Sequence, residues 1–421
     1  MGDEMSKRII LSNLLILASL VLLVIIYFAP IWWVSLTAPN YPPESFPDGV
    51  RIHFHMNGVF NGCKQVEKAE ITEGEALDCV HEMDTINHYV GMYPIAAGGV
   101  IEKAFSPFLL SLLGVMLLGF ACTKPKIRTV IMSTGFAVIA VWMYLTWYGE
   151  EGLKYQPAGY IEALVKSLDQ DSERGKDQGD GSAMLEKLRE ALPEDAVSVE
   201  EFKSSEDEFT RKLAELGSEL ATEEGLGVTV AKGEVKAITD PKMSNIELLK
   251  DNFLHDQAKK PVNEREEWTG SGEQMLRWHY EKSLGRYFNN PEEIRPMVET
   301  MTAVAHAVFW MILAAMVFLV WASRKTGGLV YWLLILVPMA LPIFFIIEYS
   351  AWLWWYGHNL NEMGAFTVKP FMPTVFGQGK VAQFTTHSYP HWGFGVMVAM
   401  AVLLALAALI RRKEFKEKGI E

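Results

Sequence analysis

Cysteine is scarce in this chain, and the arrangement of the few cysteines excludes several redox centres. The 421 residues contain three cysteines, Cys63, Cys79 and Cys122, and no two of them form a CxxC pair or a haem-attaching CxxCH. No motif dedicated to flavin or to iron–sulfur binding is present either. These absences argue against a subunit that carries one of these redox cofactors.

Catalytic signatures are also missing. The sequence has no glycine-rich phosphate loop, no GxSxG and no HExxH, and the HEMDT that begins at His81 has Thr85 where a second histidine would be needed. A net charge of −13 argues against binding of nucleic acid and against docking on anionic lipid headgroups. This acidity is concentrated in 149–300, where solubility is the simpler interpretation and an acidic-partner role is the alternative.

Long hydrophobic runs, in contrast, are abundant, and each is about the ~20 residues that a membrane-spanning helix needs. They lie at 9–34, 104–121, 127–148, 301–322, 329–355 and 392–410. The first run is too long for the core of a cleaved signal peptide and ends in Trp32 and Trp33, as an interfacial anchor would. The fold class predicted is a mainly α polytopic membrane protein with about six transmembrane helices and an inserted α+β extracytoplasmic domain.

Short basic clusters predict the orientation of these spans. Clusters at 7–8, 124–128, 324–325 and 411–413 all fall on one side, which indicates that both termini are cytoplasmic in a bacterial inner membrane. The predicted order is a signal anchor (1–34), a first outer segment (35–103), two spans (104–148), an acidic soluble outer domain (149–300), two spans (301–355), an aromatic outer loop (356–391) and a last span with a basic tail (392–421). Nine of the ten histidines then lie in the outer segments, and the tenth, His306, lies about two turns inside the outer end of the fourth span.

The first outer segment places histidines on two regular faces. RIHFHMN alternates as a strand does, with Arg51, His53 and His55 on one face. DCVHEMDTINHYVGM is typical of a helix, and one stripe of it carries His81, Asp84, His88 and Met92. We therefore expect the two faces to converge.

Cys63 and Cys79 lie in this same segment, on the oxidising side of the membrane. A disulfide between them would close a loop of about 16 residues and stabilise it by ~3 kcal/mol in the chain-entropy model. The alternative is that both are thiolate metal ligands. Cys122 falls at the inner end of the second span.

The other two outer segments differ in character. The acidic domain has helix starts at Ser198 with Glu201 and at Ser244 with Glu247, a hairpin-like GVTVAKGEVKAI and an amphipathic GEQMLRWHYEKSLGRYF. The last outer loop is apolar and aromatic, so we expect it to pack over the outer ends of the spans. Within it, Pro390 prevents a helical pairing of the neighbouring histidines.

Four segments carry a resemblance to a known family. HFHMNG, INHYVGM, YGHNLN and VKPFMPTVFGQGKVAQFTTHSYPHWG resemble membrane proteins encoded beside nitrous oxide reductase in bacterial denitrification (nos) gene clusters. The resemblance covers 1–148 and 301–421 but not the acidic domain, which looks like an addition. It implies copper and a periplasmic metalloenzyme or its maturation proteins as partners, because that reductase is a multicopper enzyme served by accessory proteins.

The residue chemistry permits copper, because imidazole and thioether are suitable ligands for the cuprous ion. The predicted metal-site residues are His53, His55, His81, His88, Met92, His358, His387 and His391. Taken singly, each of these histidines is more simply a surface or hydrogen-bonded residue, and their clustering carries the hypothesis.

Two ionisable residues lie within predicted spans, where charge is costly and usually has a partner. His306 and Glu348 both fall in the outer half of the bilayer, so an interaction between them is allowed, and together they could serve a quinol or a proton. The simpler interpretations are a hydrogen bond from His306 to a neighbouring helix and an interfacial position for Glu348.

Three function classes stay open on the sequence alone. The favoured one is a non-catalytic accessory protein that binds or passes copper, or docks a maturation partner, at the outer face. The second is a quinol-linked electron-transfer subunit of a larger membrane complex. The third is a structural anchor for a membrane oxidoreductase.

Overall fold

The computed structural model describes residues 2–63, 78–175, 240–325, 327–365, 370–381 and 383–417. By contacts the chain divides into one unit of 1–169 with 242–421 and a second unit of 170–241, and the description below concerns the first. The predicted helix start at Ser198 and Glu201 and the predicted hairpin at 227–238 lie outside the described residues. Both flanks of the predicted outer domain at 149–300, up to 169 and from 242, belong to the first unit and pack in the same core as the spans.

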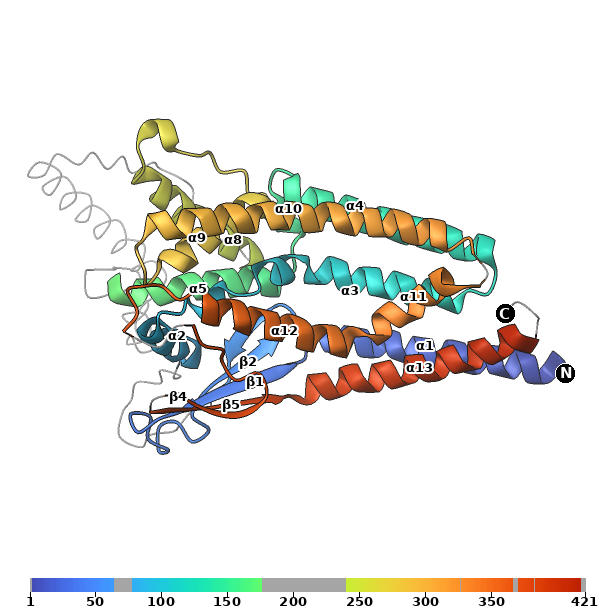
Figure 1. The fold of residues 1–421 in the computed structure, drawn as a ribbon. Coiled ribbons are helices and arrows are strands. Elements are labelled where there is room, and N and C mark those ends of the chain that lie inside the picture. Colours follow the sequence, from blue (N-terminus) through green and yellow to red (C-terminus); the bar gives the residue numbers. More distant parts are fainter. Residues whose placement is uncertain are drawn as a thin grey trace, which may run out of the picture. The chain divides into compact units, whose positions relative to one another are not determined.

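Within the described residues, five helices are long and apolar enough to cross a membrane, and a bent helix pair raises the number to six if it forms one span. The five are α1 (Gly2–Phe28), α3 (Val100–Ala121), α4 (Pro125–Tyr148), α10 (Pro291–Ala322) and α13 (Trp392–Glu417). The pair is α11 (Leu329–Met339) and α12 (Leu341–His358), which meet at 63°. The chain is therefore a multi-pass membrane protein (Figure 1).

Two predicted spans need correction. The run at 329–355 is not one straight helix, because Pro338 and Pro342 flank the break and a proline removes a helical hydrogen bond. The run at 9–34 ends as a helix at Phe28, just before Pro30, and Trp32 already belongs to a strand. Trp32 is 3% exposed and packs on Tyr349 and Phe394, so it is a core residue and not a helical interface anchor.

Each span packs against particular neighbouring helices. α1 lies along α13, and α3 contacts α4, α11 and α1 (Figure 1). Two arginines are buried among these helices: Arg128 on α4 donates to the backbone oxygens of Ser323 and Lys325, and Arg411 on α13 donates to the Ala121 oxygen at 3.3 Å. These bonds tie the connection after α10, and the end of α3, to neighbouring spans.

Strands that follow α1 in the chain and strands that precede α13 form one five-stranded antiparallel sheet. Its order is β3-β2-β1-β5-β4, with β1 (Trp32–Thr37), β2 (Val50–His55), β3 (Gly58–Asn61), β4 (Gly377–Val381) and β5 (Phe384–Pro390). β1 thus pairs with β2 on one side and with β5, from the other end of the chain, on the other. The last outer loop therefore adds two strands to the sheet, which its apolar composition did not predict.

One face of the sheet forms the core. Val50 and Ile52 are fully buried against α2 (Cys79–Val90), whose Met83 packs in the same cluster. Further along the same face, Phe54 packs on Tyr349 of α12 with ring centroids 5.4 Å apart. Alternation along the strands leaves the opposite face for polar side chains.

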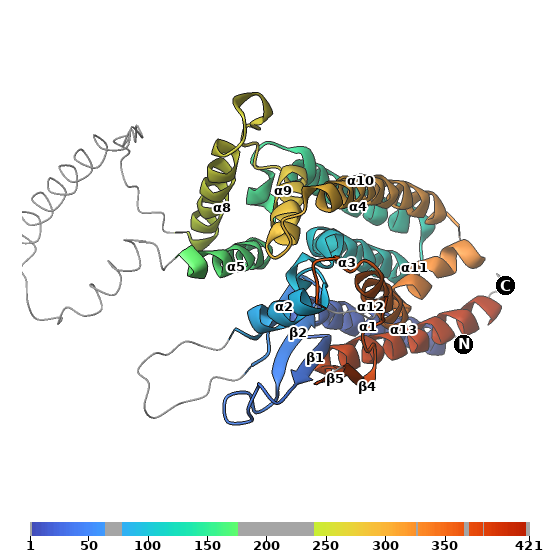
Figure 2. The same ribbon diagram turned by 60° about the vertical axis from the view of Figure 1, so that its left-hand side comes forward.

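Helices from the part of the chain between α4 and α10 cover one end of the spans (Figure 2). They are the 3-10 turn η2 (Gly152–Tyr155), α5 (Ala158–Gly175), α8 (Pro241–Ala258), the 3-10 turn η3 (Val262–Glu264) and α9 (Gly272–Gly285). α9 was predicted as an amphipathic stretch. α8, however, begins at Pro241, ahead of the predicted start at Ser244.

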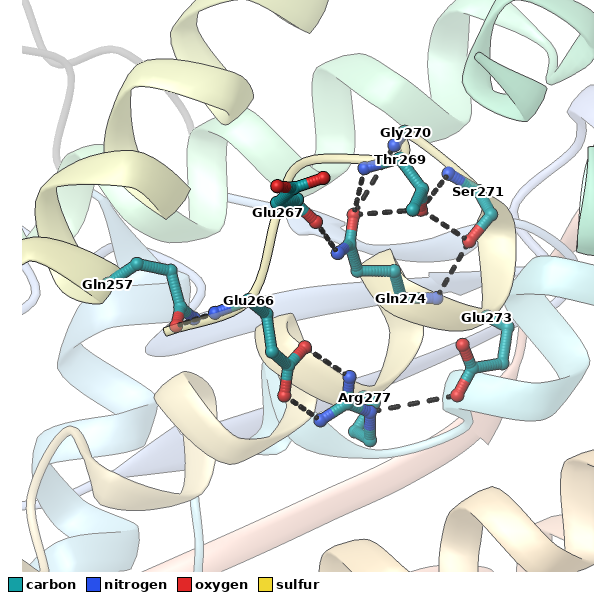
Figure 3. A network of polar contacts seen from close by, with 9 residues as sticks. All are labelled: Gln257, Glu266, Glu267, Thr269, Gly270, Ser271, Glu273, Gln274 and Arg277. Carbon is teal, nitrogen blue, oxygen red and sulfur yellow. Dashed lines mark hydrogen bonds and ion pairs between the residues drawn. The ribbon is translucent and has the colours of Figure 1, made fainter. Parts of the chain in front are cut away.

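A polar network fixes the loop that precedes α9 (Figure 3). The Gln274 side-chain oxygen accepts from the Thr269 backbone N–H at 2.9 Å, and Ser271 caps the helix by accepting from the Gln274 N–H. Arg277 forms a two-pronged ion pair with Glu266. Because the Thr269 oxygen in turn accepts from the Glu151 N–H, the loop is joined to the end of α4.

Candidate functional site

The polar face of the sheet gathers histidines from both ends of the chain, and we call it the histidine face. It comprises Trp33, Arg51, His53, His55, His387, Tyr389 and His391. The strand register establishes it, because Trp33 pairs with both His53 and Tyr389, and directly paired residues point to the same side. The predicted alternation of Arg51, His53 and His55 is thus what the strand shows.

Two histidines of this face, His53 and His391, approach each other with ring centroids 5.0 Å apart. His53 Nε2 is buried and has no hydrogen-bond partner among the described residues. His55 Nδ1 lies 3.2 Å from the Phe28 oxygen and can donate to it, which leaves the lone pair on Nε2. His391 Nδ1 accepts from the Trp392 N–H at the start of α13. His53 Nε2 and His55 Nε2 can therefore each offer a lone pair, and His391 lies beside His53.

These three rings are held in the neutral form. Burial lowers the pKa of His53 to about 4, and electrostatic repulsion from His391, Arg51 and His55 lowers it further. Burial also lowers the pKa values of His55 and His391. A metal ion binds neutral imidazole, so no proton has to leave His53 at neutral pH.

Aromatic packing holds the histidine face in place. The Arg51 guanidinium lies over the Trp33 ring at 4.0 Å, and Trp33 contacts Tyr389 at 5.4 Å. Asp48 lies 3.7 Å from Arg51 and offsets part of its positive charge. Among the described residues, no three His, Cys, Asp or Glu side chains stand ready to enclose a metal ion.

The predicted convergence with the helix stripe does not occur. α2 packs its apolar residues on the core face of the sheet, so its histidines cannot reach the opposite face. His88 stacks instead on Phe288 at 4.8 Å, and Met92 is buried in the main core with the spans. His81 remains on α2, and His358 stacks on Trp354 at 4.4 Å.

Cys63 and Cys79 are joined by a disulfide with their Cα atoms 5.9 Å apart. The bond links the end of the strand region at β3 to the first residue of α2. Since both sulfurs are used in it, neither is a thiolate ligand in this structure. Cys122 is a free cysteine.

The two ionisable residues of the spans have separate partners. His306 Nδ1 lies 2.8 Å from the Tyr148 hydroxyl, and the two rings are stacked 5.7 Å apart. Glu348 instead interacts with Glu102 of α3. Each of the two residues therefore has its own partner, in place of the interaction between His306 and Glu348 that the sequence allowed.

Sequence reasoning missed one contact between segments that carry the family resemblance. Asn361, 1% exposed, donates its backbone N–H to the Gly91 oxygen at 2.7 Å and its side-chain amide to Glu293 at 2.9 Å and to Tyr93 at 3.3 Å. INHYVGM and YGHNLN thus meet directly. The signal available in the sequence was that INHYVGM and YGHNLN each combine apolar residues with polar ones.

Comparison with known proteins adds no relative. No family model, no curated protein and no solved structure matches this chain.

Proposed function

We propose that this chain is an integral membrane accessory protein of a periplasmic copper-dependent respiratory enzyme such as nitrous oxide reductase. In this proposal it binds a cuprous ion on the histidine face and presents it to a soluble partner. The resemblance of four segments to proteins of denitrification clusters supports the choice of metal and partner. The single observation that carries the binding site is the buried, unpartnered Nε2 of His53 beside His55 and His391.

The coordination chemistry fits a cuprous ion better than a divalent one. Cuprous ion accepts few ligands and binds imidazole, whereas a closed zinc site needs four ligands. His53 and His55 are two residues apart on one strand, so both side chains stand on the same side at roughly 7 Å spacing. His391 can complete a third position if its ring gives up the Trp392 N–H.

The predicted orientation would place this site outside the cytoplasm. The chain termini lie together at the far end of α1 and α13 from the sheet (Figure 1). If the basic ends are cytoplasmic, as the positive-inside pattern predicts, the histidine face is on the periplasmic side. A soluble copper enzyme or maturation protein could then reach it without crossing the membrane.

A competitive titration tests the proposal. The purified protein in detergent would compete with a chromophoric cuprous chelator, alongside His53→Ala, His55→Ala and the control His358→Ala, which lies on α12 and not on the sheet. We expect one ion per wild-type chain, affinity at least about tenfold weaker in the first two variants and no change in the control. Equal affinity in all four proteins, or no binding by the wild type, would overturn the site.

A second function is supported by the Tyr148–His306 pair. The hydrogen-bonded pair lies in the membrane-facing part of α4 and α10, where a quinol hydroxyl could exchange with the tyrosine, as a quinol-linked electron-transfer subunit would need. Binding of a short-chain quinone, followed by tryptophan fluorescence, should then weaken in Tyr148→Phe and His306→Ala. Unchanged binding in both would remove this alternative.

A further inference from the structure

A backbone segment at the end of β3 lies against the ring of His53. A Cβ placed on Gly62 would be 3.0 Å from His53 Nε2 and 3.0 Å from His53 Cδ2. The Gly62 backbone therefore passes close to this edge of the ring, where Nε2 is buried. We call residues 61–63 the cover segment, because they lie between Nε2 and any ligand that approaches from that side.

Hydrogen bonds fix the position of the cover segment. β3 ends at Asn61, and the next N–H, that of Gly62, donates to the Arg51 oxygen at 2.9 Å. The Arg51 N–H points back at Cys63 Sγ at 3.4 Å, and sulfur is a weak acceptor. The Asn61 side-chain oxygen accepts from the Cys63 N–H at 3.0 Å. Each of these bonds can be exchanged for a bond to water, so they position the segment without locking it.

The disulfide adds a covalent tie. It joins Cys63, at the end of the cover segment, to Cys79, with the two Cα atoms 5.9 Å apart. Cys79 is 0% exposed at the start of α2, and Asp78 caps that helix by accepting from the Val80 N–H at 2.9 Å. Since α2 packs in the same core cluster as β2, the cover segment is tied to an element that stays fixed relative to His53.

A reductant can reach one of the two sulfurs. Cys63 is partly exposed, whereas Cys79 is fully buried. A thiolate of a dithiol reductant attacks Cys63 Sγ, the S–S bond breaks, and Cys79 leaves as a thiolate that takes up a proton. The second thiol of the reductant then displaces Cys63. Two electrons and two protons have passed to the protein, which now has two thiols, and the reductant has become a disulfide.

We propose that the Cys63–Cys79 disulfide is a redox-controlled gate for His53, which keeps the cover segment over Nε2 when oxidised and releases it when reduced. Its effect on a metal ion rests on the function proposed above, whereas its effect on access to His53 does not. An ion binds the closed form only during openings of the cover, so the apparent affinity is reduced by the fraction of chains that are open.

Chemical modification tests the gate without metal. Diethyl pyrocarbonate adds to an unprotonated imidazole nitrogen, and peptide mass spectrometry of the whole protein in detergent gives the rate at each histidine. We expect His53 to react at least about fivefold faster in Cys63→Ser with Cys79→Ser than in the wild type. His387 is the internal control, because β1 separates its strand from β2, and its rate should not change. Cys122→Ser, which removes the free cysteine, is the matched control variant.

Two further readouts guard against an effect of misfolding. The double variant should melt cooperatively, and its Gly62 amide should exchange hydrogen faster than in the wild type. Treating the wild type with a dithiol should produce the same two changes, in His53 modification and in Gly62 exchange, without any substitution. Equal His53 rates with and without the disulfide would overturn the gate, and so would unchanged exchange at Gly62.

A cuprous titration separates the gate from the metal proposal. The serine variant is used here, because free thiols themselves bind cuprous ion. We expect it to bind the ion at least about tenfold more tightly than the wild type. Faster modification of His53 with no copper bound by either protein would support the gate and remove the metal site. Equal affinity despite faster modification would overturn the role of the gate in metal binding.

Discussion

His53 and His391 face one another with ring centroids 5.0 Å apart, although one follows the first span and the other precedes the last. β1 makes this possible, because it hydrogen-bonds to β2 on one edge and to β5 on the other. The histidine face is therefore a product of sheet pairing between chain ends.

The contact at Gly91 should be sensitive to a single methyl group. Gly91 has φ 90°, and a Cβ there would lie 2.7 Å from the Asn361 backbone oxygen. We expect Gly91→Ala to lower the free energy of unfolding by about 1–3 kcal/mol, from backbone strain and the clash. Gly395→Ala, where a Cβ meets nothing within 4 Å, is the control. Equal melting temperatures for the two variants in detergent would contradict the placement of Asn361.

Arg411 should matter far more than its neighbour. It is 0% exposed and bonds to the Ala121 oxygen, while Arg412 is exposed. Arg411→Met removes a buried ion pair with Glu414 and the bond to the Ala121 oxygen and should cost about 3–5 kcal/mol, whereas Arg412→Met should stay within about 0.5 kcal/mol. Thermal melts of the two variants measure this difference, and similar melting temperatures would refute the buried position.

His279 should make the protein less stable in acid. Its ring lies against Leu164, Ser167 and Ser283, and burial lowers its pKa to about 3. The unfolded chain takes up a proton below about pH 6.5, but the folded chain does not until about 3, so stability falls as pH drops through this window, by up to about 1.4 kcal/mol per pH unit.

The test is the slope of melting temperature against pH. His279→Asn should melt lower than the wild type at pH 7 but show a shallower slope between pH 6 and 4. His255→Asn, at an exposed position on α8, should keep the wild-type slope. If His279→Asn and the wild type lose stability in parallel, the buried histidine is not the cause.

The disulfide should make the segment that contains Cys63 and Cys79 sensitive to reductant. Alkylation without reductant should label Cys122 alone, and labelling of Cys63 and Cys79 should require prior reduction. Removing the bond by Cys63→Ser with Cys79→Ser should cost about 3 kcal/mol, since the loop separation is 16 residues. Three labelled cysteines in unreduced protein would be incompatible with this bond.

Local patterns predicted local structure well. Alternation predicted β2 and its polar face, and the hydrophobic runs predicted the helices α3, α4, α10 and α13. The end of α1 at Phe28 and the bend before Pro342 were missed, because a run of apolar residues looks the same in a helix, a break and a buried strand.

The histidine face could not be predicted from any single segment of the sequence. His53 meets His391 only because β1 pairs with both β2 and β5, and a pairing across most of the chain leaves no local pattern. His88 was expected near His53 because both are regularly placed in one segment. The apolar stripe of α2 instead directs it to the core face of the sheet.

X-ray absorption spectroscopy of the cuprous-loaded protein tests the central claim most directly. The account predicts one copper per chain with low coordination and imidazole nitrogen scattering, and loss of both in a His53→Ala, His55→Ala double variant that still melts cooperatively. Sulfur scattering, or the same bound copper in the double variant, would show that the histidine face is not the copper site.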